Sequence, residues 1–444
     1  MTINRASDAE VLNDTPTMRI VIVGGGAGGL ELATKLGRAY RKSTAVSVLL
    51  LDKHPFHVWK PLFHEVASGS LDVDMDGIDF RSHAANHGFE FQLGTLDTLD
   101  RTRKEITLDS ILDDDGAVLI PERYIDYDIL VIAIGSITND FGIPGVRSHC
   151  LTIDDTHEAE RFHKGLLNQF LKIKAEKKDS PLTVTIVGAG ATGVELTAEL
   201  YKVADYLRAY GFTNIDRSSL IVNLIEASGR ILNALPPRIA VMAERVLNEL
   251  GVRILVNTKV QSVGATGVFV DDGAFLPSDI TVWCAGVKCQ EVLDHIGGLP
   301  TNRNHQIIVN SVLQAEDDES IFALGDCAAF EQGDGTLVPP RAQSAHQMAA
   351  VVATNIQRQL KGQALKPFRY RDHGSLVSFA EYTSVGVLSY MTKHRVFVEG
   401  GIAKYLYVSL YRLHQVALHG YFNTFLMMIV GRINRKLRPR LKLH

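Results

Sequence analysis

Two glycine-rich turns contain the residues of this chain that are best suited to chemistry. The first is Gly24-Gly25-Gly26-Ala27-Gly28-Gly29 and the second is Gly188-Ala189-Gly190-Ala191-Thr192-Gly193. Both fit the pattern GxGxxG, in which glycines allow a tight turn and a close approach of the backbone to a pyrophosphate. The pyrophosphate would then lie at the positive N-terminus of the following helix. The turns therefore predict two dinucleotide sites.

An acidic residue follows each turn at the end of the next predicted strand. Asp52 lies 28 residues after Gly24, and Glu226 lies 38 residues after Gly188 because of an insertion around residues 211–219. A carboxylate at this position accepts hydrogen bonds from ribose hydroxyls. At the second turn it would also repel a 2′-phosphate, so Glu226 favours NADH over NADPH. Arg230, four residues on, has the charge to receive such a phosphate and leaves NADPH open.

The elements that must position these turns are short buried strands and amphipathic helices. The first unit reads as a strand over 19–23, a helix over 30–40 and a strand over 46–52, and the second as a strand over 183–187, a helix over 194–207 and a strand over 220–226. A strand, a glycine turn, a helix and a second strand begin a parallel α/β sheet. We therefore predict an α/β fold with two Rossmann-like dinucleotide-binding domains.

Three further buried runs end in glycine or acidic turns. They are ILVIAIGS with Gly135, TVWCAGV with Ala285 and Gly286, and IFALGDCA with Asp326. A carboxylate at a strand end can accept a ribityl hydroxyl, although Asp326 alone would be an ordinary turn or cap residue. Two dinucleotide sites are most simply explained by FAD and a nicotinamide nucleotide.

The charge distribution and the cysteines limit the remaining function classes. The formal net charge is −4, but no acid follows Glu399 and eight Lys/Arg do, so the first 399 residues carry −12. Such a basic, apolar end suggests an acidic partner surface. The four cysteines form no CxxC or metal spacing, and His54, His57 and His64 are predicted to be packing or turn residues. We predict no metal site, a loose N-terminal tail and a reducing intracellular compartment.

Three longer stretches carry a family resemblance. They are HVWKPLFHEVASGSLD (57–72), PPRAQSAHQMA (339–349) and SLYRLHQVALHGYFNTFLMM (409–428), with the ending RPRLKLH. With these stretches the chain resembles the bacterial type II NADH dehydrogenases, the single-subunit, non-proton-pumping NADH:quinone oxidoreductases among the two-dinucleotide flavoproteins. The resemblance implies hydride transfer from NADH to FAD, then two-electron transfer to a membrane quinone, either ubiquinone or menaquinone.

The resemblance also implies a domain order and a set of cofactor contacts. The domains are a flexible tail (1–17), the first part of an FAD domain (18–150), an NADH domain (151–289), the second part of the FAD domain (290–365) and a membrane-association region (366–444). The FAD contacts are Gly24, Gly25, Gly26, Ala27, Gly28, Gly29, Asp52, Lys53, Lys60, Gly135, Asp326 and Ala342. The NADH contacts are Gly188, Gly190, Ala191, Thr192, Gly193, Glu195, Glu226, Ala285 and Gly286.

Gln343, Gln347 and Glu195 are the candidate catalytic residues. The glutamines lie four residues apart on one helical face, and neutral amides can donate to a quinone carbonyl. By themselves they would be exposed or capping residues, and only the family pattern AQxxxQ makes them quinone ligands. Glu195 is either a first-turn acid favoured by the helix dipole or a carboxylate that positions the nicotinamide or relays protons to the quinone.

Two related enzyme classes and one non-enzymatic class are the alternatives to this assignment. Disulfide reductases need a dithiol near the first unit or inside the second, but no cysteine precedes Cys150, and Cys284 and Cys289 come too late. Sulfide:quinone oxidoreductases share the quinone and the tail but need cysteines facing the flavin, so they rank second. A protein that holds FAD and NADH without turnover is the third alternative.

The C-terminal segment is predicted to lie in a membrane surface. Polar residues recur every three or four positions over 409–423 on an otherwise apolar helix, which is typical of interfacial helices. The run 415–430 has 16 residues, fewer than the roughly 20 that a span needs. We expect Arg412, Arg432, Arg435 and Lys436 to face anionic lipid at the cytoplasmic face of the bacterial inner membrane, as a peripheral protein. A core helix is the alternative, nucleic acid is not expected, and a homodimer stays open.

Overall fold

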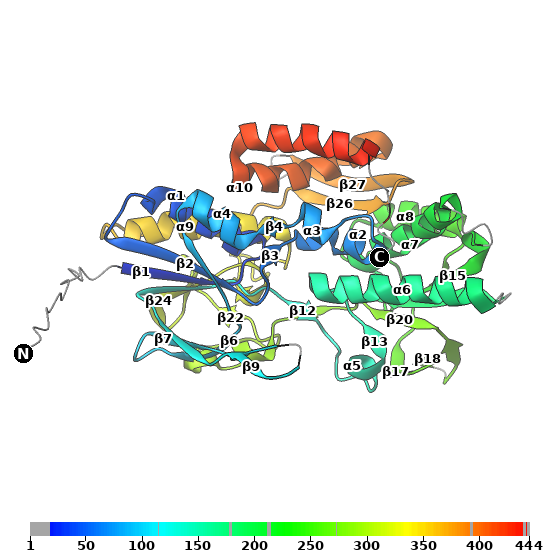
Figure 1. The fold of residues 1–444 in the computed structure, drawn as a ribbon, viewed down its shortest axis with the longest axis horizontal. Helices are drawn as coiled ribbons and strands as arrows, with labels where there is room; N and C mark the ends of the chain where they lie inside the picture. Colours follow the sequence, from blue (N-terminus) through cyan, green and yellow to red (C-terminus); the bar gives the residue numbers. More distant parts are fainter. Residues whose placement is uncertain are drawn as a thin grey trace, which may run out of the picture.

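The computed structural model describes most of the chain. The described residues are 18–113, 115–176, 180–210, 215–271, 273–390, 394–437 and 441. The predicted tail, 1–17, lies outside them. Figure 1 shows two α/β units side by side, with the C-terminal helix α10 along the top of both.

The first unit is built on a six-stranded sheet. Its order is β23 (Gln314–Ala315), β24 (Asp318–Ala323), β11 (Ile129–Ile132), β1 (Met18–Val23), β2 (Val46–Asp52) and β5 (Glu90–Leu93). All neighbours are parallel except β23 and β24. The strands are apolar runs because helices α1 (Ala27–Tyr40) and α9 (Ala342–Gln359), which contact each other, help to bury them.

The second unit is built on a five-stranded parallel sheet. Its order is β13 (Cys150–Leu151), β20 (Ile280–Trp283), β14 (Leu182–Val187), β15 (Leu220–Ile225) and β16 (Arg253–Leu255). Its helices are α6 (Thr156–Glu176), α7 (Ala191–Ala209) and α8 (Pro237–Leu250). The prediction of two Rossmann-like units in an α/β fold is confirmed. The predicted domain boundaries stay predictions.

Smaller elements join and flank the two sheets. Strands β12 (Ile137–Thr138) and β21 (Val287–Lys288) pair where the chain crosses between the units. Two three-stranded sheets lie at the edge opposite to α10: β10 (Arg123–Asp126), β7 (Glu105–Leu108) and β6 (Leu96–Asp100), and β17 (Val260–Gly264), β18 (Gly267–Val270) and β19 (Phe275–Pro277). The short elements are β3 (Phe56–His57), α2 (Phe63–Ser68), α3 (Val73–Asp76), β4 (Ile78–Asp79), α4 (Phe80–His87), β8 (Ile111–Leu112), β9 (Val118–Ile120), α5 (Val146–His149), β22 (Ile307–Ile308) and β25 (Ala328–Ala329).

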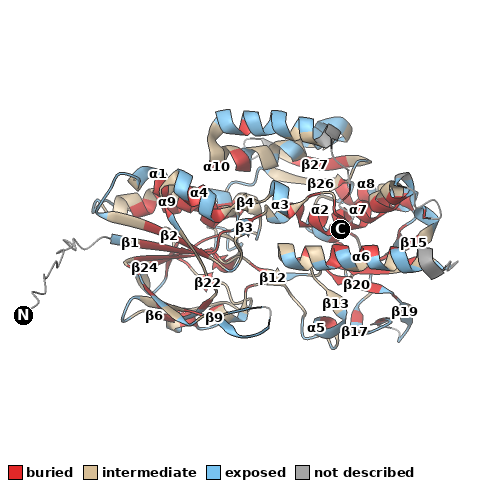
Figure 2. Ribbon diagram, viewed as in Figure 1, coloured by how far each residue is buried: buried red, intermediate tan, exposed pale blue. Residues whose placement is uncertain are grey.

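The C-terminal region is a hairpin sheet capped by one long helix. Strands β26 (Gly374–Phe379), β27 (Thr383–Tyr390) and β28 (His394–Glu399) are antiparallel. Helix α10 (Gly400–Leu437) is broken at Gly420, where φ is 79°. The chain reverses at this break, and the second half runs back above the first in Figure 1. Figure 2 shows that the upper half is mostly exposed, whereas the lower half has buried positions.

A candidate active site at two glycine turns

The two glycine turns have the same backbone geometry. Gly24 and Gly188 each end a strand with a positive φ, +105° and +101° respectively. A Cβ on Gly24 would lie 2.3 Å from the Ala133 carbonyl oxygen, and one on Gly188 would lie 2.6 Å from the Ala285 nitrogen. Each turn therefore lies tightly against the end of a neighbouring strand, and only glycine fits at its first position.

The third residue of each turn leaves a cradle for a phosphate. Gly26 and Gly190 are the N-caps of α1 and α7, and a Cβ on either would meet no atom within 4 Å. Backbone N–H groups and the positive end of the helix dipole face this space. The residues present thus fit a dinucleotide pyrophosphate at both turns.

The predicted acids hold the turns in the same way. Asp52 Oδ2 accepts a hydrogen bond from the Gly25 N–H at 2.6 Å, and burial raises the pKa of Asp52. Glu226 Oε2 accepts the equivalent bond from the Ala189 N–H at 3.0 Å, while Oε1 accepts from the N–H and the hydroxyl of Ser228, both at 2.8 Å. Because each carboxylate oxygen can accept more than one bond, both acids can still bind a ribose.

Arg230 is engaged by the protein itself. Its guanidinium donates to the Asn233 carbonyl at 2.8 Å and to the Leu235 carbonyl at 2.9 Å. These contacts cap the turn that follows β15. Arg230 is thus occupied within the protein, and the selection of NADH by Glu226 stays a prediction.

Ser136 brings together two residues that were predicted to contact FAD. Lys60 Nζ donates to the Ser136 carbonyl at 2.7 Å, and the Ser136 hydroxyl donates to Asp326 Oδ2 at 2.7 Å. Gly135, next to it, has φ +72° and open space where a Cβ would be. The sequence marked Ser136 only as the end of a strand, and the structure adds it to the site.

Lys53 is turned away from this group and toward the second unit. Its Nζ lies 3.1 Å from Asp155 Oδ2, and His54 Nε2 lies 3.3 Å from the same oxygen. Although burial opposes it, these two contacts hold the pKa of Asp155 below its usual range. A flavin contact for Lys53 stays a prediction, and the structure gives it a role as a bridge between the units.

Gln343 and Gln347 hold the segment that leads into β26. Gln347 accepts from the Arg371 N–H at 2.9 Å and donates to the Arg371 carbonyl at 2.8 Å. Gln343 accepts from the His373 N–H and donates to the Gly374 carbonyl, both at 3.1 Å. The two amides thus imitate a neighbouring β-strand, a role that the sequence did not show. Their contact with a quinone stays a prediction.

Glu195 is buried at the junction of four elements. Its Oε1 accepts from the Ser378 N–H of β26 at 2.9 Å, and its Oε2 lies 3.6 Å from His64 Nδ1 of α2. Burial raises the pKa of Glu195 to about 8 and lowers the pKa of His64 to about 4. Burial and then the Glu195 charge raise the pKa of Tyr407 from α10. Glu195 is therefore a buried carboxyl group with a raised pKa, and it lies beyond the first turn of α7, which begins at Ala191.

Strand β26 connects the candidate catalytic groups. Gly374 at its start contacts Gln343, and Ser378 near its end contacts Glu195. A strand rises about 3.3 Å per residue, so these contacts are roughly 13 Å apart. The strand thus runs between helix α9 of the first unit and helix α7 of the second, beneath α10.

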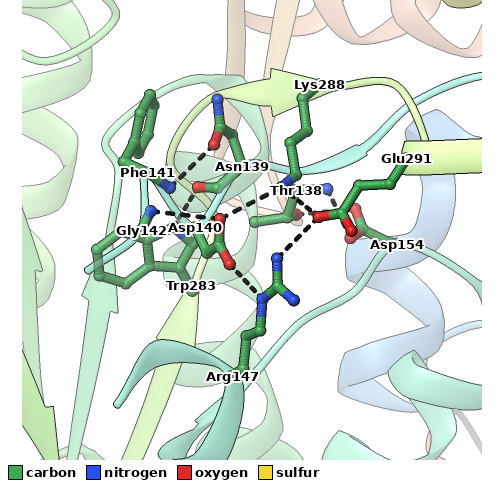
Figure 3. Close-up of polar contacts among 10 residues, drawn as sticks. All are labelled: Thr138, Asn139, Asp140, Phe141, Gly142, Arg147, Asp154, Trp283, Lys288 and Glu291. Carbon is green, nitrogen blue, oxygen red and sulfur yellow. Dashed lines mark hydrogen bonds and ion pairs between the residues drawn. The ribbon is translucent and has the colours of Figure 1, made fainter. Parts of the chain in front are cut away.

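Ion pairs join the two segments, at β12 and β21, in which the chain crosses between the units (Figure 3). Asp140 accepts from Arg147 at 2.5 Å and from Lys288 at 3.4 Å, and both cations also contact Glu291. The hydrogen bond from Arg147 lowers the pKa of Asp140 to about 2. Trp283 Nε1 donates to the backbone carbonyl next to Asp140 at 2.9 Å. These contacts fix where β12 and β21 lie relative to each other.

Only part of the predicted polar stripe of α10 faces the protein, since Gln415 is buried and Asn423 is exposed, while most apolar residues of the second half face outward. His414 and Gln415 are buried, and Arg412 donates to Gln415 Oε1 at 2.5 Å. Arg432 is exposed, and the side chains of Arg435 and Lys436 lie outside the described residues. The exposed apolar residues of the second half are Tyr421, Phe422, Phe425, Leu426, Met427, Met428, Ile429, Val430 and Ile433.

The apolar segment of α10 extends beyond the run 415–430. Among the described residues, one helical stretch, Gly400–Asn434 of α10, is long and apolar enough to cross a membrane. The run 415–430, with 16 residues, is only part of this stretch. The break at Gly420 divides this stretch.

Comparison with known proteins identifies the family. A family model described as pyridine nucleotide-disulphide oxidoreductase matches residues 18–349. A type II NADH:quinone oxidoreductase of Haemophilus influenzae is 42% identical over 441 residues, which cover 96% of this chain and 99% of that protein. The chain belongs to the type II NADH:quinone oxidoreductases. The prediction of an FAD- and NADH-dependent NADH:quinone oxidoreductase is confirmed.

More distant members and neighbours share the fold of this family. A type II NADH:quinone oxidoreductase of Staphylococcus aureus is 27% identical over 83% of this chain and 89% of its own. NDH2 of Plasmodium falciparum, solved in complex with NADH, matches with TM-score 0.81 and 19% identity, over 96% of this chain and all of that one. The sulfide:quinone oxidoreductase of Aquifex aeolicus matches with TM-score 0.72 and 19% identity, over 95% and 96%. These two structures show the fold alone.

The cysteines of this type II NADH:quinone oxidoreductase are unsuited to thiol chemistry. All four are free. Burial raises the pKa of Cys150 and of Cys284 to about 12 and that of Cys327 to about 11. Since the thiolate is the reactive form, these thiols are inert at neutral pH. Among the described residues, no group of His, Cys, Asp or Glu is placed to hold a metal ion.

Proposed function

We propose that the chain passes two electrons from NADH through FAD to a membrane quinone at the cytoplasmic face of a bacterial inner membrane, without pumping protons. The observation that carries this proposal is the repeated turn: each sheet has one glycine turn, one open cradle and one acid in the same geometry. Two such turns in one chain accommodate a resident dinucleotide and a dinucleotide substrate.

The first turn is assigned to FAD and the second to NADH. Asp52 would hold the FAD ribose, and Ser136 with Asp326 would face the ribityl chain. When bound, FAD supplies the two-electron chemistry, so the protein's task is to align the reactants. Glu226 accepts from the NADH ribose, and the ion pairs of Figure 3 join the segments at β12 and β21, where the chain crosses between the units.

The proton needed by the quinone is assigned to Glu195. Because burial raises its pKa to about 8, Glu195 holds a proton near neutral pH. It lies at the junction with α10, the helix that would face the bilayer. Gln343 and Gln347 would orient the quinone through the segment 371–374 that they hold, or through a direct amide contact.

An anionic lipid surface is the proposed partner of α10. In the sequence, the exposed apolar residues of 421–433 are followed by the basic C-terminal residues, and no acid follows Glu399. Basic residues near anionic lipid contribute about 1 kcal/mol each, whereas half-buried apolar side chains contribute a comparable amount each and are more numerous. We expect the apolar contribution to dominate. A homodimer would cover the same face and is the competing occupant.

The sulfide:quinone alternative is disfavoured by the thiols. That chemistry needs cysteine sulfur as an electron acceptor beside the flavin. Here Cys289 and Cys327 are buried, and their sulfurs lie 3.3 Å from the Asp326 carbonyl and 3.4 Å from the Ile132 carbonyl. Neither is placed as a reactive thiolate.

Anaerobic spectroscopy tests the proposed function. The purified protein should be yellow, its flavin band should bleach with NADH, and the band should recover with a soluble quinone. A variant with all four cysteines replaced by serine should keep both half-reactions within a few-fold. A colourless protein that cannot be reconstituted with FAD would refute the proposal, and loss of reoxidation in the serine variant would favour sulfide chemistry.

Liposome binding tests the membrane partner. Because the first half of α10 packs on the body, the truncation should remove only residues 421–444. It should abolish binding to anionic vesicles, which high salt loosens without releasing the intact chain. Val241→Ser, at an exposed apolar residue of α8, is the matched control and should bind normally. A dimer that dissociates on truncation, with no vesicle binding by the intact chain, would assign this face to a second copy.

A further inference from the structure

Two imidazoles connect the first glycine turn to helix α10. His57 Nδ1 lies 2.9 Å from the Gly25 carbonyl oxygen, and His57 Nε2 lies 2.9 Å from His414 Nε2. Both side chains are buried, with 4% and 7% exposure. Gly25 belongs to the turn assigned to FAD, whereas His414 belongs to the helix assigned to the membrane surface.

The hydrogen atoms along this connection follow from the chemistry of its ends. A carbonyl oxygen only accepts, so His57 Nδ1 carries a hydrogen. Burial lowers the pKa of His57 to about 4 and that of His414 well below its usual value, so both rings are neutral. His57 Nε2 is then a bare acceptor, and His414 Nε2–H donates to it. The bonds run in one direction, from His414 to His57 to Gly25.

The connection is fixed by packing on both sides. The Trp59 ring is stacked on His414, with centroids 5.9 Å apart and planes at 17°. Phe80 lies beside His57 and against Gly25, where a Cβ would meet its ring at 2.3 Å. Arg38 of α1 donates to the Leu418 carbonyl of α10 at 2.6 Å, which ties the same helix to the same unit.

The bond to Gly25 controls the direction of the next amide. In a trans peptide the C=O and the following N–H point in opposite directions. His57 draws the Gly25 carbonyl toward itself, and the Gly26 N–H of the same peptide group therefore points the other way, toward the cradle. Asp52 holds the Gly25 N–H at 2.6 Å, so both peptide groups of Gly25 are fixed.

We propose that His57 and His414 are positioning residues for FAD. Through them, α10 packed against the first unit holds the pyrophosphate turn in the conformation that binds FAD. The inference rests on the proposed function, because it assumes that FAD occupies the first turn. It makes FAD affinity depend on His414, a residue more than 380 positions away along the chain from Gly25. His57 and His414 do not touch reacting atoms.

FAD affinity of matched variants tests the inference. His414→Phe keeps an aromatic ring against Trp59 and removes the N–H donor, and His57→Phe removes the bond to Gly25. Flavin-fluorescence titration of the apoprotein should show FAD binding weakened about tenfold in the first variant and at least as much in the second. The double variant should resemble His57→Phe alone, because both residues act along one path. His414→Gln, which can still donate, should recover most of the affinity.

His419→Phe is the control on the same helix. Its ring contacts His83 of α4 at a centroid distance of 5.3 Å, and its replacement should leave FAD affinity unchanged. Equal FAD affinity in His414→Phe and the parent overturns the inference, and so does equal weakening by His419→Phe. If His414→Phe does not fold, His414→Gln against His414→Leu decides. A parent chain that binds no FAD at all would instead overturn the proposed function.

Discussion

The two glycine turns have the same backbone geometry but are stabilised by different hydrogen-bond donors. The Gly25 carbonyl of the first turn accepts from the His57 imidazole at 2.9 Å. The corresponding Ala189 carbonyl of the second turn accepts from the backbone N–H of Leu232 at 2.8 Å. The first turn is therefore linked through side chains to α10, whereas the second is closed by its own unit. This difference suits a cofactor that stays bound and a substrate that must exchange.

The largest effects on dinucleotide binding are expected when one methyl group is added to each turn. A Cβ on Gly29 would lie 1.8 Å from the Gly24 carbonyl oxygen, and one on Gly193 would lie 2.1 Å from that of Gly188. We expect Gly29→Ala to yield protein without flavin. Gly193→Ala should stay yellow but lose more than about a hundredfold in kcat/KM for NADH.

Flavin absorbance before and after NADH measures both outcomes. Gly165→Ala, in helix α6 with no atom within 4 Å of the added Cβ, is the control and should be unaffected. Loss of flavin from Gly193→Ala to the same degree as from Gly29→Ala would show that the two turns are not independent.

Replacing the acid of the second turn should change the nucleotide preference and spare the flavin. Glu226→Arg removes the ribose acceptor and adds a phosphate donor. The loss of one charged hydrogen bond is worth about 1.5–3 kcal/mol, which is roughly a ten- to hundredfold decrease in kcat/KM for NADH, while NADPH should improve. Glu226→Gln keeps an acceptor for the Ala189 N–H and controls for collapse of the turn. Unchanged NADH kinetics in Glu226→Arg would remove Glu226 as the selector.

The pH dependence of stability should separate the histidines from Glu195. Burial lowers the pKa of His57 and of His64 from 6.5 to about 4, and that of His83 to about 3, so these groups favour unfolding as pH falls below 6.5. Burial raises the pKa of Glu195 from 4.5 to about 8, so this group favours unfolding as pH rises from 4.5 to 8. The opposite signs predict a stability maximum near pH 6.5.

Urea unfolding at about pH 5, 6.5 and 8 measures this profile. Between pH 4.5 and 6.5 these three histidines and Glu195 together give the unfolded chain a net two extra protons, and His414, whose pKa burial also lowers, acts in the same direction. The free energy of unfolding should therefore fall by roughly 4 kcal/mol or more from pH 6.5 to 5. Glu195→Gln should remove the decline above pH 6.5 and keep the acid limb. A decline that persists in this variant would show that Glu195 is not its source.

Removing either glutamine should loosen β26. Gln347→Leu deletes two hydrogen bonds to Arg371, which should lower the free energy of unfolding by about 1–2 kcal/mol. If Gln343 and Gln347 also orient the quinone, stopped-flow traces should show slower flavin reoxidation and normal reduction by NADH. Gln363→Leu, at an exposed residue after α9, is the control. Equal slowing of both half-reactions would leave the glutamines with a structural role alone.

The smallest effect is expected at Lys53. Its contact with Asp155 is partly exposed, so the pair adds little stability. Lys53→Ala should change FAD affinity by less than about threefold, whereas Lys60→Ala removes the bond to the Ser136 carbonyl and should weaken FAD more. A larger FAD defect in Lys53→Ala would restore the predicted flavin contact.

Local patterns in the sequence were enough to predict both turns and their acids. The glycines of a turn and the strand that precedes them are adjacent in the chain, and the steric demands at Gly24 and Gly188 come from backbone that any such turn must approach. Asp52 ends β2 and Glu226 directly follows β15, so their position follows from the same unit.

The contacts between distant segments could not be predicted in this way. Lys53 and Asp155 are 102 residues apart, and His57 and His414 are 357 residues apart. The helical period of 409–423 identified a polar face on α10 but gave no information on what would cover it. Burial of Glu195 likewise depends on β26 and α10, so its raised pKa is a property of the folded chain.

The break at Gly420 determines whether the enzyme meets its quinone by diffusion in the plane of the membrane. An unbroken α10 of 38 residues would be about 57 Å long, far longer than the bilayer core of about 30 Å. Because the chain reverses at Gly420, both halves of α10 can lie on the same side of a membrane surface. Docked in this way, the enzyme and its quinone would both diffuse laterally in one leaflet. Their encounter rate would then depend on the number of quinones per unit area and not on a concentration in solution.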